Sequence, residues 1–307
     1  SKLYSNDIPK VYSTSLNDGN SIVYNNIPPP VPQKIQNYKG VVSNSEGSRS
    51  SRTDINLFDG SPDRVYPDGI PIPNYNNASG LHTTIQSVIN QKFIDFEYII
   101  IDGGSNDGSL DVIKQFSDKI TFWVSEKDKG IYDAMNKGIE KANGEYLIFL
   151  NSGDEFFEDD TIEKVFQNNE NADVYYGDTI ITNEQGEVLR NRRLRPPANL
   201  SWQSMQMGMI VCHQSIFVKK TIAVAYQTKY RISADIDWLI RCLKQAKTVC
   251  NTGLVISKFL DGGMSQTNQR RGLQERYEIL NFHFGYVKNG FNHLKMIARL
   301  LANKLSN

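Results

Sequence analysis

Residues 145–156 read EYLIFLNSGDEF, and this stretch decides how the rest of the chain is interpreted. A short, almost entirely apolar run ends abruptly at Asn151 and is followed by Ser152, Gly153 and Asp154. A run this short and this apolar is typical of a strand that is buried on both faces of a parallel sheet. Ligands bind beyond the carboxyl ends of the strands in such sheets, so we expect Asp154 at the mouth of a binding site.

Strand and helix patterns alternate just before this stretch. We expect strands at 96–101, where the sequence is FEYIII, and at 119–124, and helices at 110–116 and 131–142. An alternation at this spacing predicts right-handed βαβ units and an α/β sheet, mixed but mostly parallel, with helices on its faces. A helical pattern also follows Leu81, but Pro71 and Pro73 before it argue against an ordinary central strand, because each proline removes a ladder donor.

The second half of the chain is more mixed. It predicts strands, a hairpin and helices: strands at 173–176, 209–218 and 248–259, a hairpin within 178–190, and helices at 160–167, 233–245 and 274–304. We therefore divide the chain into a polar N-terminal arm over 1–68, an α/β domain over 69–272 and a C-terminal helical extension over 273–307. The arm is rich in Ser, Asn, Gly and Pro and predicts at most short strands, at 21–24 and 41–42.

Composition excludes some partners. Lys+Arg and Asp+Glu number 34 each, so no global field favours nucleic acid or an anionic membrane. The three cysteines lack metal-ligand spacing and fit a reducing compartment. The sequence shows no apolar membrane span and no signal-peptide pattern, so we expect a cytoplasmic protein. Peripheral contact with the inner face of the plasma membrane remains open. The sequence does not define an oligomeric state.

Three acidic residues lie at or near expected strand or helix ends: Asp102, Asp154 and Asp235. The chain has neither a P-loop nor a GxGxxG motif, so carboxylates at the edge of the sheet suit a metal-bridged diphosphate better than a Rossmann dinucleotide. A hard divalent ion, Mn²⁺ or Mg²⁺, can neutralise the charge that grows on a leaving diphosphate. Asp154 is the expected metal ligand, with Asn151 and Ser152 in support.

Six ordered motifs resemble those of family 2 glycosyltransferases, and among these the bacterial exopolysaccharide enzymes of the colanic-acid type. They cover residues 74–270 and read IIIDGGSNDGS (99–109), EKDKGIYDAMNKGI (126–139), YLIFLNSGDEF (146–156), CHQSIF (212–217), ISADIDWLIR (232–241) and DGGMSQTN (261–268). An ordered series is far more specific than any single motif. The resemblance implies a GT-A (Rossmann-like) fold and an inverting transfer of a sugar from a nucleotide-diphosphate donor.

The resemblance also implies how the donor is held. By family position, Tyr75, Asn76 and Asp102 contact the nucleoside, and Asn136 contacts the diphosphate or the sugar. The metal motif falls on residues 151–154. Asn151 and Gly153 occupy positions that are usually acidic, so metal binding rests mainly on Asp154.

The same resemblance places the catalytic base at Asp235 and a supporting carboxylate at Asp237. Inversion is a single displacement, so a base must take the proton of the acceptor hydroxyl on the face opposite the leaving diphosphate. In the first turn of a helix over 233–245, Asp235 would be favoured in its ionised form by the helix dipole.

The expected function is sugar transfer to a saccharide or lipid-linked acceptor during surface polysaccharide synthesis. Two alternatives remain at this point: a nucleotidyltransferase, and a non-catalytic sugar-binding protein of the same fold.

Several further polar residues each have two interpretations. His213 lies either in the core or near the acceptor. The arginines within 190–195 either face an anionic lipid-linked acceptor or are solvated, and Arg270 and Arg271 belong either to a lid or to an ordinary loop.

Overall fold

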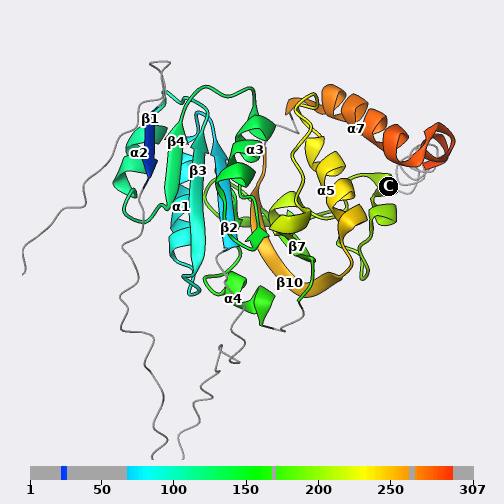
Figure 1. Ribbon diagram of the computed structural model, residues 1–307, viewed down its shortest axis with the longest axis horizontal. Helices are drawn as coiled ribbons and strands as arrows, with labels where there is room; N and C mark the ends of the chain where they lie inside the picture. Colours follow the sequence, from blue (N-terminus) through cyan, green and yellow to red (C-terminus); the bar gives the residue numbers. More distant parts are fainter. Residues whose placement is uncertain (1–21, 26–67, 168–170, 263–266, 293–307) are drawn as a thin grey trace, which may run out of the picture.

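The computed structural model describes residues 22–25, 68–167, 171–262 and 267–292 (Figure 1). One mixed sheet runs through this part of the chain in the order β1-β4-β3-β2-β5-β9-β7-β10-β6, and β8 pairs with β7. The strands are β1 Ile22–Asn25, β2 Asp68–Asn74, β3 Phe96–Asp102, β4 Phe122–Ser125, β5 Tyr146–Leu147, β6 Glu155–Phe156, β7 Val174–Thr182, β8 Val188–Asn191, β9 Ile216–Lys219 and β10 Val249–Leu260. The longest pairings, β2 with β3 and β7 with β10, are parallel, which confirms the expected mixed, mostly parallel sheet.

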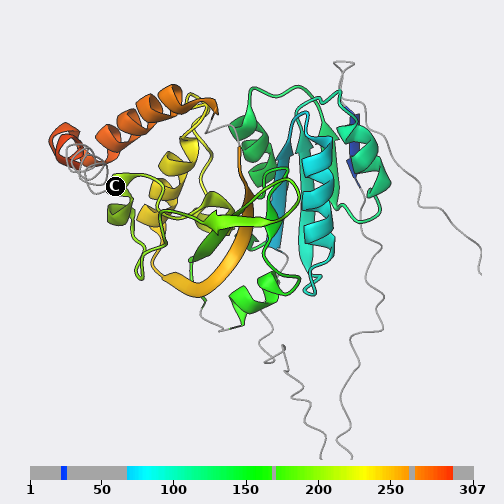
Figure 2. The same ribbon diagram turned by 180° about the vertical axis from the view of Figure 1, so that it is seen from behind.

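Helices cover both faces of the sheet. The helices are α1 Ala78–Ile89, α2 Ser109–Gln115, α3 Ile131–Lys141, α4 Thr161–Phe166, α5 Ala234–Gln245 and α7 Gln269–Phe284. α3 and α5 pack into the apolar core on one face, whereas α1, α2 and α4 pack into the core on the other (Figures 1 and 2). α7 contacts α5 and forms an outer layer, so the expected C-terminal helical segment is confirmed.

The apolar run at 146–150 is buried on both faces of the sheet, as predicted. Leu147 and Phe149 belong to the core beneath α3 and α5, whereas Tyr146, Ile148 and Leu150 belong to the opposite core. The regular strand β5, however, ends at Leu147, so the predicted strand over 146–150 was too long.

Pro71 explains why β5 is short. The Ile148 N–H donates to the Gly69 carbonyl of β2 at 3.1 Å, but the next ladder bond would need an N–H from Pro71, which has none. The ladder between β2 and β5 therefore stops after one bridge, Gly69 with Leu147.

The prediction that the two prolines exclude a central strand was wrong. β2 lies between β3 and β5, and it pairs with β3 along its whole length, from Asp68 to Asn74. Backbone groups of successive residues point to opposite edges of a strand, so Pro71 and Pro73 face the β5 edge, on the same side as Gly69. The edge facing β3 keeps every donor. The fold thus accepts both prolines because only the shorter ladder loses bonds.

The predicted strand over 209–218 was also wrong in its first part. His213–Ser215 form a 3₁₀ turn, η3, and only Ile216–Lys219 pair as strand β9. The Ser215 N–H donates to the Cys212 carbonyl at 3.0 Å, which closes this turn. In this turn, His213 packs on Phe149 in the core beneath α3 and α5, and Gln214 reaches the Asp154 carboxylate.

Most of the remaining elements agree with expectation within a few residues, and β7 and β8 form the predicted hairpin. β6 was not predicted, and α7 begins five residues before the expected start at residue 274. Residues 293–304 of the expected helical segment lie outside the described residues. β1 lies within the N-terminal arm and pairs antiparallel with β4, whereas the expected strand at 41–42 lies outside the described residues. The boundaries proposed after residues 68 and 272 stay predictions. Within the described ranges, each helix is too short or too polar to cross a lipid bilayer.

Candidate active site

A cleft of about 1720 Å³ opens at the carboxyl ends of the central strands. It is lined by residues that follow β3, β4 and β5 and by residues of α3, α5 and α7. Single small-molecule sites usually occupy roughly 300–1000 Å³, so this cleft has room for two substrates. Of the residues predicted from sequence, Tyr75, Asn151, Ser152, Asp154 and Asp235 line the cleft; Asn76, Asp102, Asn136 and Asp237 are not among its lining residues.

Asp154 is a buried carboxylate at the floor of the cleft. It accepts hydrogen bonds from Gln214 Nε2 at 2.6 Å and from the Leu260 N–H at 3.1 Å. Burial raises the pKa of Asp154 to about 6, and these hydrogen bonds oppose part of that rise. Residues of η3 and β10 therefore hold the Asp154 side chain in place. Its carboxyl group loses its proton near pH 6.

The donor set beside Asp154 fits a divalent cation that is shared with a ligand. The side-chain oxygen of Asn151 is buried and has no hydrogen-bond partner, although it is of a type that Mg²⁺ and Mn²⁺ bind. No cluster of three or more His, Cys, Asp or Glu suited to a metal occurs within the described part of the chain. Asp154 and Asn151 would therefore hold such an ion together with phosphate oxygens and water, as Mg²⁺ is often held.

Asp235 lies in the first turn of α5, as predicted, and lines the same cleft as Asp154. The Tyr132 hydroxyl from α3 lies 3.4 Å from Asp235 Oδ1 and also donates to the Ile232 carbonyl at 2.9 Å. Burial raises the pKa of Asp235 to about 6, whereas the Ile236 N–H and the Tyr132 hydroxyl favour the charged form. At neutral pH the carboxylate is mostly ionised, as a proton acceptor must be.

Asp102 lies directly beneath the cleft, where it holds a turn. Its carboxylate accepts from the side chains of Asn74, Ser105 and Ser125 at 2.6–2.7 Å and from the N–H groups of Gly104 and Ser105. Gly103 and Gly104, which follow it, line the cleft. Asp102 thus fixes the backbone at the end of β3, and its direct contact with a nucleoside stays a prediction.

Two of the three residues after β2, Tyr75 and Asn77, line the cleft, whereas Asn76 does not. Tyr75 lines the cleft with 65% of its side chain exposed, which leaves its ring free to stack on a ligand. Asn76 has a φ of 47° and bonds the loop after β3, since its side chain accepts from the Asn106 N–H. Asn77, which the sequence did not single out for the cleft, lines it and donates to the Ser152 carbonyl at 2.8 Å.

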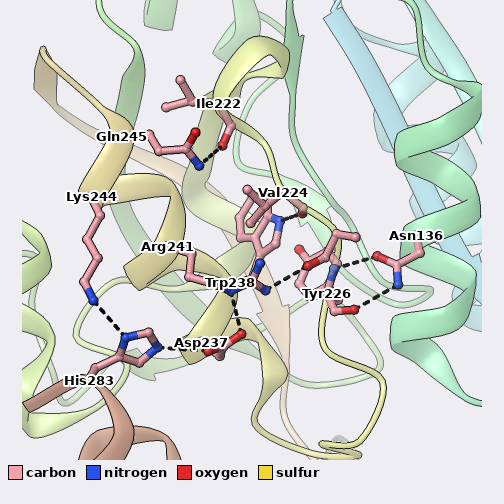
Figure 3. A network of polar contacts seen from close by, with 11 residues as sticks. Asn136, Ile222, Val224, Tyr226, Asp237, Trp238, Arg241, Lys244, Gln245 and His283 are labelled. Atoms are coloured by element: carbon pink, nitrogen blue, oxygen red, sulfur yellow. Dashed lines mark hydrogen bonds and ion pairs between the residues drawn. The ribbon is translucent and has the colours of Figure 1, made fainter.

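Asn136 and Asp237 bond other parts of the chain (Figure 3), and neither is among the lining residues of the cleft. Asn136 bonds both the N–H and the carbonyl of Tyr226 and thereby joins α3 to the loop before α5. Asp237 points to the opposite side of α5 from the cleft, where it accepts from Arg241 at 2.8 Å and lies 2.9 Å from His283 of α7. The predicted roles of Asn136 in donor binding and of Asp237 in catalysis stay predictions.

His213 and Gln214 belong to the cleft, although sequence reasoning left His213 undecided and did not select Gln214. Gln214 orients Asp154, as described above. His213 stacks on Phe149, and its Nε2 lies 2.5 Å from the Tyr226 hydroxyl. Burial lowers the pKa of His213 to about 4, so the ring is neutral. The signal available in the sequence was the motif CHQSIF itself.

Most arginines of the predicted basic loop are already paired. Arg190 binds Asp261 at 2.9 Å, Arg195 binds Asp178, and Arg192 donates to the carbonyls of Met209 and Ile210. Arg193 is exposed at the cleft. Carboxylates and carbonyls of the chain thus bind three of the four arginines, Arg192 and Arg193 line the cleft, and contact of this loop with an anionic acceptor stays a prediction.

Glu275 of α7 holds the segment that leads into α5. Its buried carboxylate accepts from the N–H groups of Arg231 and Ile232, each at 2.8 Å, and of Ser233 at 3.1 Å. The Ser233 hydroxyl in turn donates to the Gly272 carbonyl at 3.1 Å. α7 therefore fixes the backbone two residues before Asp235, a long-range contact that no local sequence signal indicated.

Comparison with known proteins agrees with the fold. Over 209 residues the chain is 31% identical to the PGL/p-HBAD biosynthesis glycosyltransferase of Mycobacterium tuberculosis, covering 64% of this chain and 78% of that protein. Among solved structures, it resembles a fragment of S. aureus TarS in complex with UDP-GlcNAc, with a TM-score of 0.57 and 14% identity over 69% of this chain and 64% of that one. Of a longer TarS chain it covers only 39%.

A mannosyltransferase from Pyrobaculum calidifontis, solved with GDP-Man and Mn²⁺, gives a TM-score of 0.52 at 13% identity over 81% of this chain and 82% of that one. These structures show that the fold is of the GT-A glycosyltransferase type. Residues 70–231 match the model described as glycosyl transferase family 2, and the chain belongs to that family. It is thus a glycosyltransferase, and the nucleotidyltransferase alternative is dropped.

Replacing Glu275 with alanine should destabilise the protein. Three backbone N–H groups would lose their acceptor, and an unsatisfied buried donor costs about 1–3 kcal/mol, part of which water can restore at this position. We expect Glu275→Ala to lower the free energy of unfolding by about 2–3 kcal/mol, measured by urea denaturation. Glu278→Ala, an exposed change on the same helix, is the control and should stay within about 0.5 kcal/mol. Equal midpoints for the two variants would contradict this function of Glu275.

Proposed function

We propose that the protein is an inverting glycosyltransferase that moves a sugar from a nucleotide-diphosphate donor to a saccharide or lipid-linked acceptor during surface polysaccharide synthesis. The observation that carries the proposal is that Asp154, after β5, and Asp235, in α5, line one cleft. A displacement needs one group for the leaving diphosphate and another for the incoming hydroxyl. The cleft offers a separate carboxylate for each.

The donor is proposed to occupy the half of the cleft at the ends of β2, β3 and β5. Tyr75 is placed to stack on the base, and the turn held by Asp102 offers backbone groups to the nucleoside. Asn76, Asn136 and Ser152 are retained as proposed donor contacts, although the side chain of each also bonds the protein itself. Asp154 and Asn151 would hold the cation and the diphosphate together. Such an ion supplies positive charge opposite the leaving group.

Asp235 is proposed as the general base. Its carboxylate accepts the proton of the acceptor hydroxyl while that oxygen bonds to the anomeric carbon and the bond to the diphosphate breaks on the opposite face. The Tyr132 hydroxyl keeps the carboxylate oriented. Asp237 is retained as a supporting carboxylate only in the indirect sense that it ties α5 to α7.

The cellular setting is part of the same proposal. Donor sugars activated as nucleotide diphosphates place the reaction in the cytoplasm, and a lipid-linked acceptor would bring the protein to the inner face of the plasma membrane. Similar proteins support the substrate class, because one is named a PGL/p-HBAD biosynthesis glycosyltransferase and another was solved with UDP-GlcNAc.

Removing the base should abolish turnover and spare donor binding. We expect Asp235→Asn to lower donor hydrolysis about 10²- to 10⁴-fold, because a positioned general base contributes about that much. The assay screens a panel of nucleotide sugars with Mn²⁺ or Mg²⁺, and donor affinity is measured by calorimetry. Asp111→Asn, an exposed change on α2, is the control. Equal turnover in Asp235→Asn and wild type would refute the assignment, and donor binding without any wild-type turnover would favour a non-catalytic sugar-binding protein.

The rate should depend on pH through the same carboxylate. Because burial raises the pKa of Asp235 to about 6 and the base must be deprotonated, kcat/KM should level off above about pH 6. Below that pH it should fall about tenfold per pH unit. The profile is measured at saturating metal, so that the second carboxylate, Asp154, stays ionised. A profile that is flat between about pH 5 and pH 8 would contradict a base with this pKa.

A further inference from the structure

Arg276 is a half-buried cation on α7 that lines the cleft. Within the part of the chain that the structure describes, it forms no ion pair or hydrogen bond. Other arginines nearby are paired: Arg271 binds Glu275 and Arg241 binds Asp237, each at 2.8 Å. A guanidinium that loses water without gaining a partner is unfavourable, and burial accordingly lowers the pKa of Arg276. A bound anion would supply the hydrogen-bond acceptors and the negative charge that the Arg276 guanidinium lacks.

Arg231 provides a second cation that lines the cleft. Its side chain is exposed and lines the cleft, where its Nη1 would lie 2.9 Å from a Cβ added at Gly130. The two arginines are joined through one residue, because Glu275, next to Arg276 in the chain, accepts from the Arg231 N–H at 2.8 Å. The backbone that carries both guanidinium groups is therefore fixed before a ligand arrives.

Arg276 lies on α7, which packs against α5, and the Arg231 guanidinium reaches Gly130, two residues before Tyr132, whose hydroxyl contacts Asp235. Arg231 stands four residues before Asp235, in the segment that Glu275 holds. The stem of Arg276 packs close to Gly208, at the end of the 3₁₀ helix η2 Trp202–Met207, since a Cβ there would lie 3.1 Å from Arg276 Cδ. Tyr75 and the turn after β3 follow β2 and β3, which lie on the opposite side of β5 from β9 and β7.

We propose that Arg276, together with Arg231, binds a phosphate-type anion on the acceptor, close to the hydroxyl that Asp235 deprotonates. The proposal rests on the function proposed above and names a chemical feature of its acceptor. A guanidinium presents parallel N–H donors that match two phosphate oxygens, and charge-assisted hydrogen bonds are stronger than neutral ones.

The test uses inorganic phosphate as the probe and the full chain saturated with UDP or GDP in the presence of Mg²⁺. Calorimetry measures phosphate affinity while the nucleoside diphosphate fills the donor end. We expect Arg276→Gln to weaken phosphate binding about tenfold or more and Arg276→Lys to weaken it less, because lysine keeps the charge and loses the paired donors. Arg270→Gln, an exposed change on the same helix outside the cleft, should bind phosphate like wild type.

Two arms separate the acceptor from the donor as the source of the anion. Donor hydrolysis, in which water replaces the acceptor, should be unchanged in Arg276→Gln. If hydrolysis falls in step with phosphate affinity, or if the nucleoside diphosphate displaces phosphate from the wild type, the arginine serves the donor and the proposal is overturned. Equal phosphate affinity in Arg276→Gln and wild type also overturns it.

The same measurements distinguish failure of this proposal from failure of the glycosyltransferase function proposed above. If the wild type binds no nucleoside diphosphate and hydrolyses no donor, the function proposed above fails. Phosphate titration of the free protein and of Arg276→Gln then still decides whether the arginine binds an anion.

Discussion

The buried carboxylate of Asp154 is the point at which the separate parts of this fold meet. Gln214 of η3 and the Leu260 N–H of β10 bind its side chain, and the Thr84 hydroxyl of α1 donates to its backbone carbonyl at 2.8 Å. A carboxylate with this burial persists only where donors replace water. The apolar run before Asp154 fixes its place, because that run is buried on both faces of the sheet and cannot shift without exposing one core.

The second constraint comes from the C-terminal helix α7. It lines the cleft, holds the segment before α5 through Glu275 and holds the first turn of α5 through His283, which lies 2.9 Å from Asp237. The orientation of Asp235 thus depends on residues that follow it by forty positions or more. A helix that supports the site in this way can also line it, which is how Arg276 reaches the cleft.

Much of this architecture could be predicted from sequence. The run FEYIII and the helix that begins at Ile131 carry strong local periodicity, and the rule that ligands bind at strand ends selected Asp154. Errors arose where partners in the fold decide the outcome. Pro71 and Pro73 are tolerated because they lie on the edge of β2 that faces β5. The ladder between β2 and β5 has a single bridge, so few hydrogen bonds are lost there. The helical pattern correctly placed Asp235 in a first turn, but it could not show that Asp237, two residues later, faces α7 instead of the cleft.

The central claim is spatial: one cleft holds the diphosphate beside Asp154 and the reacting sugar carbon toward Asp235. A crystal structure with a bound nucleotide sugar tests it most directly. The account predicts the diphosphate at Asp154 and Asn151, with the Asp235 carboxylate on the opposite face of the anomeric carbon. A nucleotide bound elsewhere, or an Asp235 side chain on the same face as the diphosphate, would contradict it.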